Sequence, residues 1–460
     1  MLETARRSSV PTTTAPGTRI RRQIAYAAVG AAFAANAILI TAIWINHGHL
    51  DGSSSPAAIL QAVGQLSALM GTYLVLVGML LMARTPFLEH LFGDRGARYH
   101  KVIGVSAIVL IGAHLACSVG AFAMLDGLSF TDEFTTEILT YPYMLAALVG
   151  LVLFLVIGAS SIRFIRSHLS YETWTGIHLY AYVAIALAFG HQLAIGSDFS
   201  SHPNSRMYWV AMYVAVLTAI VSFRVVAPFV MLARHRFQVD RVVVETSDVV
   251  SIYVVGRRLE RLNARAGQYF RLRLLARNEW WRSHPFSVSA VPDGACLRFT
   301  VKALGDFSGR IQSLRPGTRV MLEGPYGALT GALRTRSRVA LIGGGIGVTP
   351  IRALFEELAG KVDVRVIYRA SGAKDLVFWD ELHKLEERPG TYVTYLVGKR
   401  GSPRLSSDPL SPSALRTLVP DIHVRDVFVC GPAPMMDAVE RSLRALGVPR
   451  RQIHTERFAA

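Results

Sequence analysis

Four histidines in the apolar first half of the chain have the type and spacing to do chemistry. His100 and His114 lie 14 residues apart in one apolar stretch, and His178 and His191 lie 13 residues apart in another. On helices, both separations correspond to about 20 Å of rise, so the histidines can pair at two matched depths. Two facing imidazoles can hold an iron porphyrin from both sides. The spacing predicts two stacked haems, one between His100 and His178 and one between His114 and His191. The alternative is that each histidine separately packs a helix through hydrogen bonds.

The second spacing poses a geometric question. Fourteen residues return to nearly the same face of a helix, whereas thirteen fall about 140° away at about 100° per residue. Either the helix with His178 and His191 is irregular, near Gly176 or Gly190, or its two haems differ in azimuth.

Six long apolar stretches must position these histidines. Each can cross about 30 Å of hydrocarbon, which takes about 20 helical residues, although the first could instead be a signal peptide. Ionisable groups inside a bilayer are costly, which makes the four histidines functional candidates. The loops on one side carry eleven Lys and Arg residues against one on the other, so both ends of the unit are expected to face the cytosol. The stretches are residues 23–45, 57–83, 102–125, 139–162, 177–197 and 207–233.

Composition supports a membrane protein. The chain has 460 residues, of which 51% are hydrophobic and only 18% are charged. A soluble protein would carry about a quarter charged residues, so the composition disfavours an ordinary cytosolic globule and excludes a disordered chain. The net charge of +17 could attract nucleic acid, but the apolar excess favours a membrane. Three cysteines, Cys117, Cys296 and Cys430, fit no zinc or disulfide pattern and are too few for a four-cysteine iron–sulfur cluster.

After Arg234 the pattern changes to that of a soluble protein. Short alternating or β-branched segments separated by turn residues predict a small antiparallel β-barrel. From about residue 334, apolar strands alternate with helical patterns, which predicts an α/β domain with a parallel sheet. The expected strand and helix pairs are 338–343 with 350–359, 362–368 with 378–386, and 426–430 with 434–446. The predicted domains are a cytosolic segment 1–22, a six-helix transmembrane bundle 23–233, a barrel domain 234–333 and the α/β domain 334–460.

Several short motifs in this half could bind cofactors. Each motif in the barrel is weak alone, because any of them could be a turn. They are His284, Pro285, Phe286 and Ser287, then Lys302, Gly305 and Ser308, then Gly324, Pro325, Tyr326 and Gly327. In the α/β domain a strand runs into glycines and then a helix, which lets a diphosphate approach the backbone at a positive helix end. We expect Thr349 to be the N-cap of that helix and Pro350 its first residue. The residues of this loop are Gly343, Gly344, Gly345, Ile346, Gly347, Val348 and Thr349.

Two further strand ends are candidates. Arg369 and Ser371 follow the second strand, where a basic residue accommodates the 2′-phosphate of NADPH. The alternative is an ordinary exposed arginine. Cys430, Gly431 and Pro432 follow another strand at the edge where ligands bind in such sheets. The alternative for Cys430 is a small buried hydrophobe.

Taken in order, these features resemble the NADPH oxidase and ferric reductase family, and the soluble half alone resembles the ferredoxin–NADP reductase superfamily. The resemblance spans about residues 60–458 and includes a terminal Glu456, Arg457 and Phe458. It implies that His284 to Ser287 hold FAD, with Lys302, Gly305 and Ser308 near its diphosphate. It also implies that Gly343 to Thr349 hold the diphosphate of the nicotinamide nucleotide. Cys430 would then lie beside the nicotinamide, with Gly431 and Pro432, and Phe458 would stack on the isoalloxazine. This chain continues past Phe458 with Ala459 and Ala460.

The resemblance and the chemistry of the cofactors together imply an electron path. NADPH gives two electrons as a hydride and a six-coordinate haem accepts one, so a flavin is needed between them. The expected path runs from NADPH to FAD, to the haem at His100 and His178, to the haem at His114 and His191, and to an outer acceptor. Oxygen, giving superoxide, is the favoured acceptor. A ferric chelate, a partner protein or a quinone are alternatives, and a transporter with a nucleotide-sensing domain would hold no haem. We expect a multi-pass protein of the cell membrane in contact with lipid, with no nucleic acid and no required protein partner.

Overall fold

The computed structural model of the protein describes residues 16–49, 55–93, 95–276, 280, 282–399, 401, 405 and 408–457. The chain divides into two compact units. One comprises Ile24–Val226, and the other comprises Ala227–Ala460 together with Met1–Gln23. The first unit contains the four histidines, and the second contains the strand motifs. The predicted boundaries at residues 22, 233 and 333 remain predictions.

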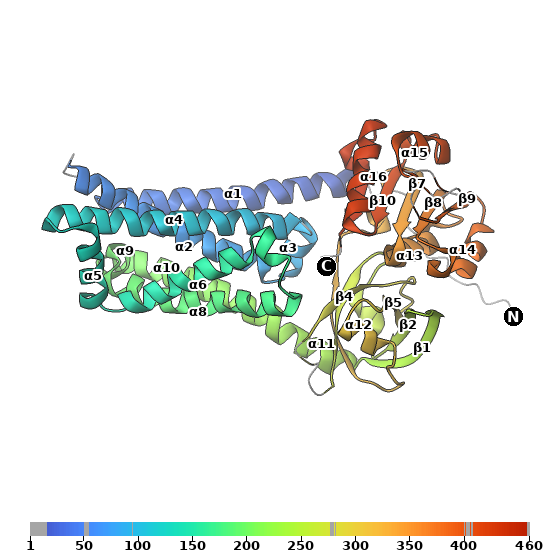
Figure 1. Cartoon of the computed structure of the whole chain (residues 1–460), viewed down its shortest axis with the longest axis horizontal. Helices are drawn as coiled ribbons and strands as arrows, with labels where there is room; N and C mark the ends of the chain where they lie inside the picture. The colour runs from blue at the N-terminus through green and yellow to red at the C-terminus, as the bar shows by residue number, and fades with distance from the viewer. Residues whose placement is uncertain are drawn as a thin grey trace. The chain divides into compact units, whose positions relative to one another are not determined.

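The first unit is a bundle of helices (Figure 1). Five helices within the described residues are long and apolar enough to cross a membrane. They are α1 (Pro16–Asn46), α2 (Pro56–Met82), α4 (Arg95–Asp126), α8 (Tyr171–Ile195) and α10 (Pro203–Ile220), the last continuing through the π-helical η1 (Val221–Val226) into α11 (Ala227–His235). Ser55 and Ser170 cap the first turns of α2 and α8. Three short helices connect them: α3 (Pro86–Phe92), α7 (Arg163–Arg166) and α9 (Ser197–Ser200).

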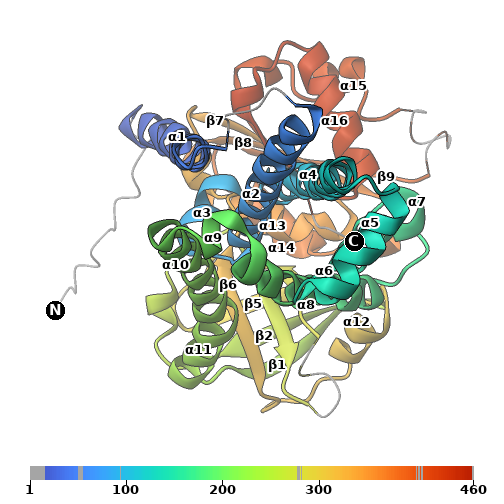
Figure 2. The ribbon, with the colours of Figure 1, turned by 90° about the vertical axis from the view of Figure 1, so that its left-hand side faces the viewer.

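The fourth apolar stretch, predicted as a single span over residues 139–162, is not one straight helix in the structure. The chain forms α5 (Phe130–Thr140) and α6 (Met144–Ser160), which meet at 115°. The bend lies at Tyr141 to Tyr143, where Tyr143 adopts a left-handed backbone conformation. The bundle therefore has five candidate spans, or six if this bent pair counts as one. Figure 2 views the bundle from the end that carries α5 and α9.

Glycines bring the histidine-bearing helices close to their neighbours. On α2, a Cβ added at Gly64 would lie 2.9 Å from the Ser118 hydroxyl of α4, and one at Gly71 would lie 3.0 Å from Ile111. On α6, a Cβ at Gly150 would lie 2.8 Å from the carbonyl oxygen of Ala184 in α8. Small residues allow such close backbone approach between membrane helices. Thus α4 packs tightly on α2, and α8 packs tightly on α6.

The strands after α11 form two antiparallel sheets rather than the predicted closed barrel. One sheet has the order β1-β2-β5, and the other has the order β4-β3-β6. Among the described residues, isolated bridges such as Gln238 to Arg319 and Val288 to Phe299 link the two sheets, and no continuous ladder runs between them. A core that includes Phe237, Ile252 and Phe270 joins the sheets. The elements are β1 (Gln238–Thr246), β2 (Val249–Val255), β3 (Tyr269–Leu274), β4 (His284–Ser287), β5 (Cys296–Lys302), α12 (Asp306–Ile311) and β6 (Val320–Tyr326).

The last part is an α/β fold with the predicted parallel sheet. Its strand order is β11-β10-β7-β8-β9, and every neighbouring pair is parallel. The first strand, β7, has β8 on one side and β10 on the other, so the strand order reverses there, which is where such sheets bind ligands. The strands are β7 (Arg338–Gly344), β8 (Asp363–Ala370), β9 (Thr391–Val397), β10 (Asp426–Cys430) and β11 (Ile453–Glu456). The helices are α13 (Val348–Leu358), α14 (Trp379–Glu386), α15 (Pro412–Leu418) and α16 (Ala433–Ala445).

Candidate functional site

The structure brings the first predicted histidine pair together. The ring centroids of His100 on α4 and His178 on α8 lie 5.9 Å apart, with 63° between the ring planes. A metal ion bonded at about 2 Å to one nitrogen of each ring would separate those nitrogens by about 4 Å. The observed ring separation leaves room for such an ion. For the second pair, the imidazole of His191 interacts electrostatically with that of His114.

The two histidines of α4 are anchored by backbone carbonyls of α2. His100 Nδ1 donates to the carbonyl oxygen of Gly78, and His114 Nδ1 donates to that of Gly64, both at 3.1 Å. The two glycines are 14 residues apart, the same spacing as the two histidines. A metal-bound histidine characteristically donates its other ring N–H to such a carbonyl, which fixes the tautomer. These hydrogen bonds leave the Nε2 atom of each ring available for a metal.

The two histidines of α8 are placed differently. The Nδ1 atoms of His178 and His191 are buried and have no hydrogen-bond partner among the described residues. Buried polar atoms normally have a hydrogen-bond partner, so a buried atom without one requires an explanation. The paired rings of His100 and His178 and the anchored tautomers on α4 fit a site that would hold a haem between α4 and α8.

Because α8 is a continuous helix from Tyr171 to Ile195, the 13-residue spacing sends its two imidazoles out at different azimuths. A regular helix favours the alternative in which the two haems differ in azimuth over the alternative of an irregular helix.

Arg224 adds a positive charge beside the first pair. Its Nε atom donates to the carbonyl oxygen of Met82 at 2.8 Å, and its guanidinium interacts electrostatically with His100 and His178. Sequence reasoning did not assign Gly64 or Gly78 to this site. The equal 14-residue spacings on α2 and α4 were the signal that could have identified the two glycines.

In the flavin region, the strand β4 carries the predicted motif. The imidazole of His284 stacks on the ring of Phe307, with centroids 4.2 Å apart. The hydroxyl of Ser287 is buried and has no hydrogen-bond partner among the described residues. An unsatisfied hydroxyl at the end of this strand fits a site for an added polar group.

The other predicted flavin contacts are used within the protein. Lys302 Nζ lies 3.2 Å from Asp248. Burial raises the pKa of the Asp248 carboxyl, but the hydrogen bonds from Lys302 and Thr246 and the charge of Lys302 together outweigh it and hold that pKa below its usual range. The Ser308 hydroxyl accepts hydrogen bonds from the backbone of Leu304 and Gly305, at 2.9 and 3.0 Å. Ser308 therefore caps the start of α12.

The glycine loop lies at the switch point of the parallel sheet. Gly343 and Gly344 end β7, and the turn Gly345–Gly347 leads into α13. A Cβ at Gly347 would lie 2.5 Å from Gly431 Cα, so the two loops touch backbone to backbone. Gly345 has a φ of +52° and no atom within 4 Å of an added Cβ, so its outer side is open. The arrangement leaves backbone N–H groups at the start of α13 available to a diphosphate.

The predicted N-cap of this helix is wrong. Gly347 already has right-handed helical angles, so α13 begins at Val348 and Gly347 is its N-cap. Thr349 therefore lies in the first turn, where its hydroxyl donates to the carbonyl oxygen of Ile346 at 3.0 Å. Val348 is fully buried.

The remaining candidates are at strand ends. Arg369, at the end of β8, donates to the carbonyl oxygens of Leu396 and Gly398 at 3.1 and 2.5 Å. Ser371 is exposed. Cys430 is fully buried, and its thiol lies 3.6 Å from the carbonyl oxygen of Glu456. Pro432 is the N-cap of α16. Phe458, predicted to stack on the flavin, lies outside the described residues.

A charge cluster missed by sequence reasoning links the two soluble regions. Glu381 of α14 contacts Arg298 of β5 at 2.8 Å and Arg352 of α13 at 2.7 Å. Burial raises the pKa of Glu381, but the hydrogen bonds and charges of Arg298 and Arg352 together outweigh it, so that pKa lies below its ordinary value. Glu456 of β11 accepts a hydrogen bond from the Leu329 backbone at 3.1 Å. These contacts hold the flavin and nucleotide regions together.

Three protein-family models match the chain in sequence order. A ferric reductase like transmembrane component matches residues 67–189, an FAD-binding domain matches residues 234–330, and an oxidoreductase NAD-binding domain matches residues 341–441. The first match includes His100, His114 and His178 and ends two residues before His191. These matches and the apolar helices make the chain a multi-pass membrane protein with FAD- and NAD-binding domains.

The chain is also similar to individual proteins. It is 29% identical over 244 residues to the glycine betaine monooxygenase reductase subunit of Chromohalobacter salexigens, covering 49% of this chain and 65% of the relative. It is 31% identical over 224 residues to the NADH oxidoreductase HCR of Escherichia coli, covering 47% and 66%. A solved structure, the FAD/NAD-binding domain of a nitric oxide dioxygenase from Vibrio cholerae, has 26% identity and a TM-score of 0.43, covering 49% of this chain and 98% of that one. The chain thus spans just under two thirds of the length of the two curated relatives.

Proposed function

Because the chain has the architecture of the NADPH oxidase and ferric reductase family, we propose that it moves electrons across a membrane from NADPH to an acceptor on the far side. The path proposed runs through FAD and two b-type haems, from the pair His100 and His178 to the pair His114 and His191. The protein lies in the cell membrane with both termini in the cytosol. That orientation rests on the distribution of Lys and Arg among the loops.

The observation that carries this proposal is the register between three helices. The carbonyls of Gly78 and Gly64 on α2 hold the Nδ1 atoms of His100 and His114 on α4. The partner histidine His178 lies across from His100, with its own Nδ1 atom buried and without a partner among the described residues. Isolated packing histidines would be expected to satisfy their ring nitrogens within the bundle.

The residues divide the work between binding and positioning. When bound, the flavin accepts a hydride as an electron pair and the haems carry electrons singly. Arg224 supplies a charge suited to a carboxylate beside the His100 and His178 pair. His284 and Ser287 of β4 would hold the flavin, and the backbone at Gly345 to Gly347 would hold the diphosphate of the nucleotide.

We propose molecular oxygen as the acceptor, reduced by one electron to superoxide. Both imidazoles of each pair would hold the iron, so electron transfer to oxygen would need no bond between oxygen and iron. A ferric chelate could accept an electron by the same route, and a partner protein or quinone would make the chain an electron-delivery subunit.

The proposal can be tested in sealed inside-out vesicles that contain the protein. Added NADPH should reduce the haems without oxygen, and admitted oxygen should reoxidise them while superoxide forms inside the vesicle. A His191→Ala variant should reduce its flavin at the normal rate but transfer no electron across the membrane. Reduction of an enclosed ferric chelate in place of oxygen would assign the other acceptor. NADPH oxidation that requires neither oxygen nor a ferric chelate would favour a partner protein or a quinone as the acceptor.

A further inference from the structure

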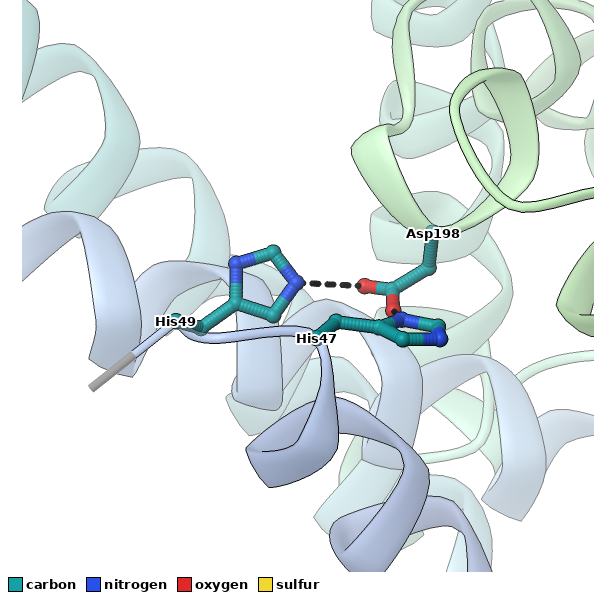
Figure 3. Close-up of side chains that lie close together, drawn as sticks. All are labelled: His47, His49 and Asp198. Carbon is teal, nitrogen blue, oxygen red and sulfur yellow. Dashed lines mark hydrogen bonds and ion pairs between the residues drawn. The ribbon is translucent and has the colours of Figure 1, made fainter. Parts of the chain in front are cut away.

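Three side chains far apart in sequence meet at one end of the helical bundle. His47 and His49 lie in the turn after α1, and Asp198 lies in α9 (Figure 3). His47 Nδ1 is 2.6 Å from one carboxylate oxygen of Asp198, and His49 Nε2 is 3.4 Å from the other. One donor atom from each residue lies within 4.8 Å of the other two. The three groups therefore converge on one point.

The carboxylate at this point is buried. Asp198 is only 4% exposed, and its ion-pair partners among the described residues are the two imidazoles. A buried carboxylate is stable only where positive charge or several hydrogen bonds compensate for the lost water. The two imidazoles each face this carboxylate with one ring nitrogen, and a bound cation would supply positive charge at the same point.

A hydrogen bond explains the position of His47 but does not explain that of His49. The Nε2 atom of His49 is buried and makes no hydrogen bond with a described residue, although it lies near the Asp198 carboxylate. Its ring is held by stacking on Trp44, with 5.7 Å between centroids. The ring of His47 is stacked on that of His202, with centroids 3.5 Å apart and planes within 4°. Both imidazoles are thus fixed by their neighbours while they face the carboxylate.

Two imidazoles and one carboxylate are a common donor set for a single transition-metal ion. Zinc and ferrous iron both use it, with open positions left for water or another ligand. We propose that His47, His49 and Asp198 form a mononuclear site for a divalent transition-metal ion. The site shares no residue with the histidine pairs or the flavin and nucleotide motifs, so it does not depend on the proposed electron path. Asp198 follows His191 by seven residues, so the proposed orientation places the site on the outer side.

The test uses zinc as the probe, because zinc is separate from any haem iron in an elemental assay. Full-length protein in detergent is stripped with a chelator, incubated with excess zinc chloride and passed through a desalting column. The zinc bound per chain is then measured by mass spectrometry. We expect one zinc ion per chain in the wild type and a loss of at least tenfold in occupancy in His49→Ala and Asp198→Asn. His168→Ala is the matched control, because its exposed imidazole hydrogen-bonds to the carbonyl oxygen of Phe164, four residues before it, and this variant should bind zinc as the wild type does.

The same samples show whether the variants fold, since their elution volume and visible spectrum should match those of the wild type. If a variant aggregates, zinc-edge X-ray absorption on the wild type still decides the question. Nitrogen and oxygen ligands at about 2.0–2.2 Å are expected, and a sulfur shell at about 2.3 Å would contradict the site. A wild-type chain that retains no zinc, or a His49→Ala variant that binds as much as the wild type, would overturn the proposal.

Discussion

The two units of the protein build their candidate cofactor sites from different parts of the chain. In the helical unit the candidate ligands are side chains, namely imidazoles whose orientation depends on carbonyls of a neighbouring helix. In the other unit the candidate nucleotide site is formed by backbone, at positions where glycine leaves room for close approach. Gly347 illustrates this, because its α-carbon faces Gly431 with no space for a side chain.

Because of this difference, the two kinds of site should be lost through opposite kinds of substitution. A side-chain site is lost when atoms are removed, and the surrounding helix packing survives. A backbone site is lost when atoms are added, because a new Cβ occupies the space that the loops or the ligand need. Substitutions in one unit should therefore leave the cofactor of the other unit in place.

The largest effect is expected from removing a ligand in the helical unit. His114→Ala and His191→Ala should each remove one of the two haems, because a single remaining imidazole does not hold the iron from both sides. The haem content per chain should fall by half, while NADPH still reduces the flavin. Pyridine haemochrome analysis and NADPH-dependent ferricyanide reduction measure these two properties, with His168→Ala as the control. Full haem content in both variants would show that the ligands are wrongly assigned.

Adding a methyl group in the nucleotide unit should have the next largest effect. In Gly347→Ala the new Cβ would lie 2.5 Å from Gly431 Cα and 2.6 Å from the carbonyl oxygen of Cys430. Overpacking of this kind costs about 1–3 kcal/mol, and we expect the KM for NADPH to rise about tenfold or more. Steady-state kinetics tests this, and the haem content should not change.

Gly309→Ala is the control for that variant, because an added Cβ there meets no atom within 4 Å. If Gly347→Ala lost haem as well, or if both alanine variants bound NADPH normally, the contrast between the two units would fail.

A glycine substitution within the helical unit sharpens the comparison. A Cβ at Gly64 would lie 2.9 Å from the Ser118 hydroxyl and 3.2 Å from its backbone nitrogen, whereas a Cβ at Gly78 would lie 3.4 Å from His100 Nδ1. Gly64→Ala should therefore shift the reduced spectrum and midpoint potential of the His114 haem more than Gly78→Ala shifts those of the His100 haem. Redox titration of both variants measures this order. Gly104→Ala, which meets no atom within 4 Å, should match the wild type, and the reverse order for the two α2 glycines would remove their positioning role.

The smallest effect is expected at Arg369, the basic side chain that we propose favours NADPH over NADH. Its guanidinium already donates to two carbonyls at the end of β9, so a phosphate would have to compete with these hydrogen bonds. Arg369→Ala should raise the KM for NADPH about threefold, as for an exposed ion pair worth about 0.5–1 kcal/mol. The KM for NADH should change less. An equal change for both nucleotides would assign Arg369 a purely structural role.

Regular geometry explains what the sequence could predict. The rise of a helix is fixed, so the spacing of His100 and His114 alone is enough to place two imidazoles at two depths. The glycine loop could be located for a similar reason, because a strand, a turn and a helix follow one another along the chain. The parallel sheet followed from the same alternation of elements.

Contacts without a periodic pattern could not be predicted. His47 and Asp198 are 151 residues apart and meet only through the packing of two turns. The bend at Tyr141 to Tyr143 interrupts an apolar run that resembles one span, and the left-handed angles of Tyr143 leave no mark in composition. The division of the strands into two antiparallel sheets depends on which strands hydrogen-bond to each other, and the sequence pattern of a strand does not reveal its partner. Thr349 was assigned as a cap from its residue type, whereas the backbone angles of Gly347 set the start of the helix.

The most direct test of the account is the haem content of the intact, folded wild-type protein. The dithionite-reduced visible spectrum, quantified by pyridine haemochrome, should show two b-type haems per chain. Folded protein without Soret absorbance would contradict the account, whatever nucleotide the other unit binds.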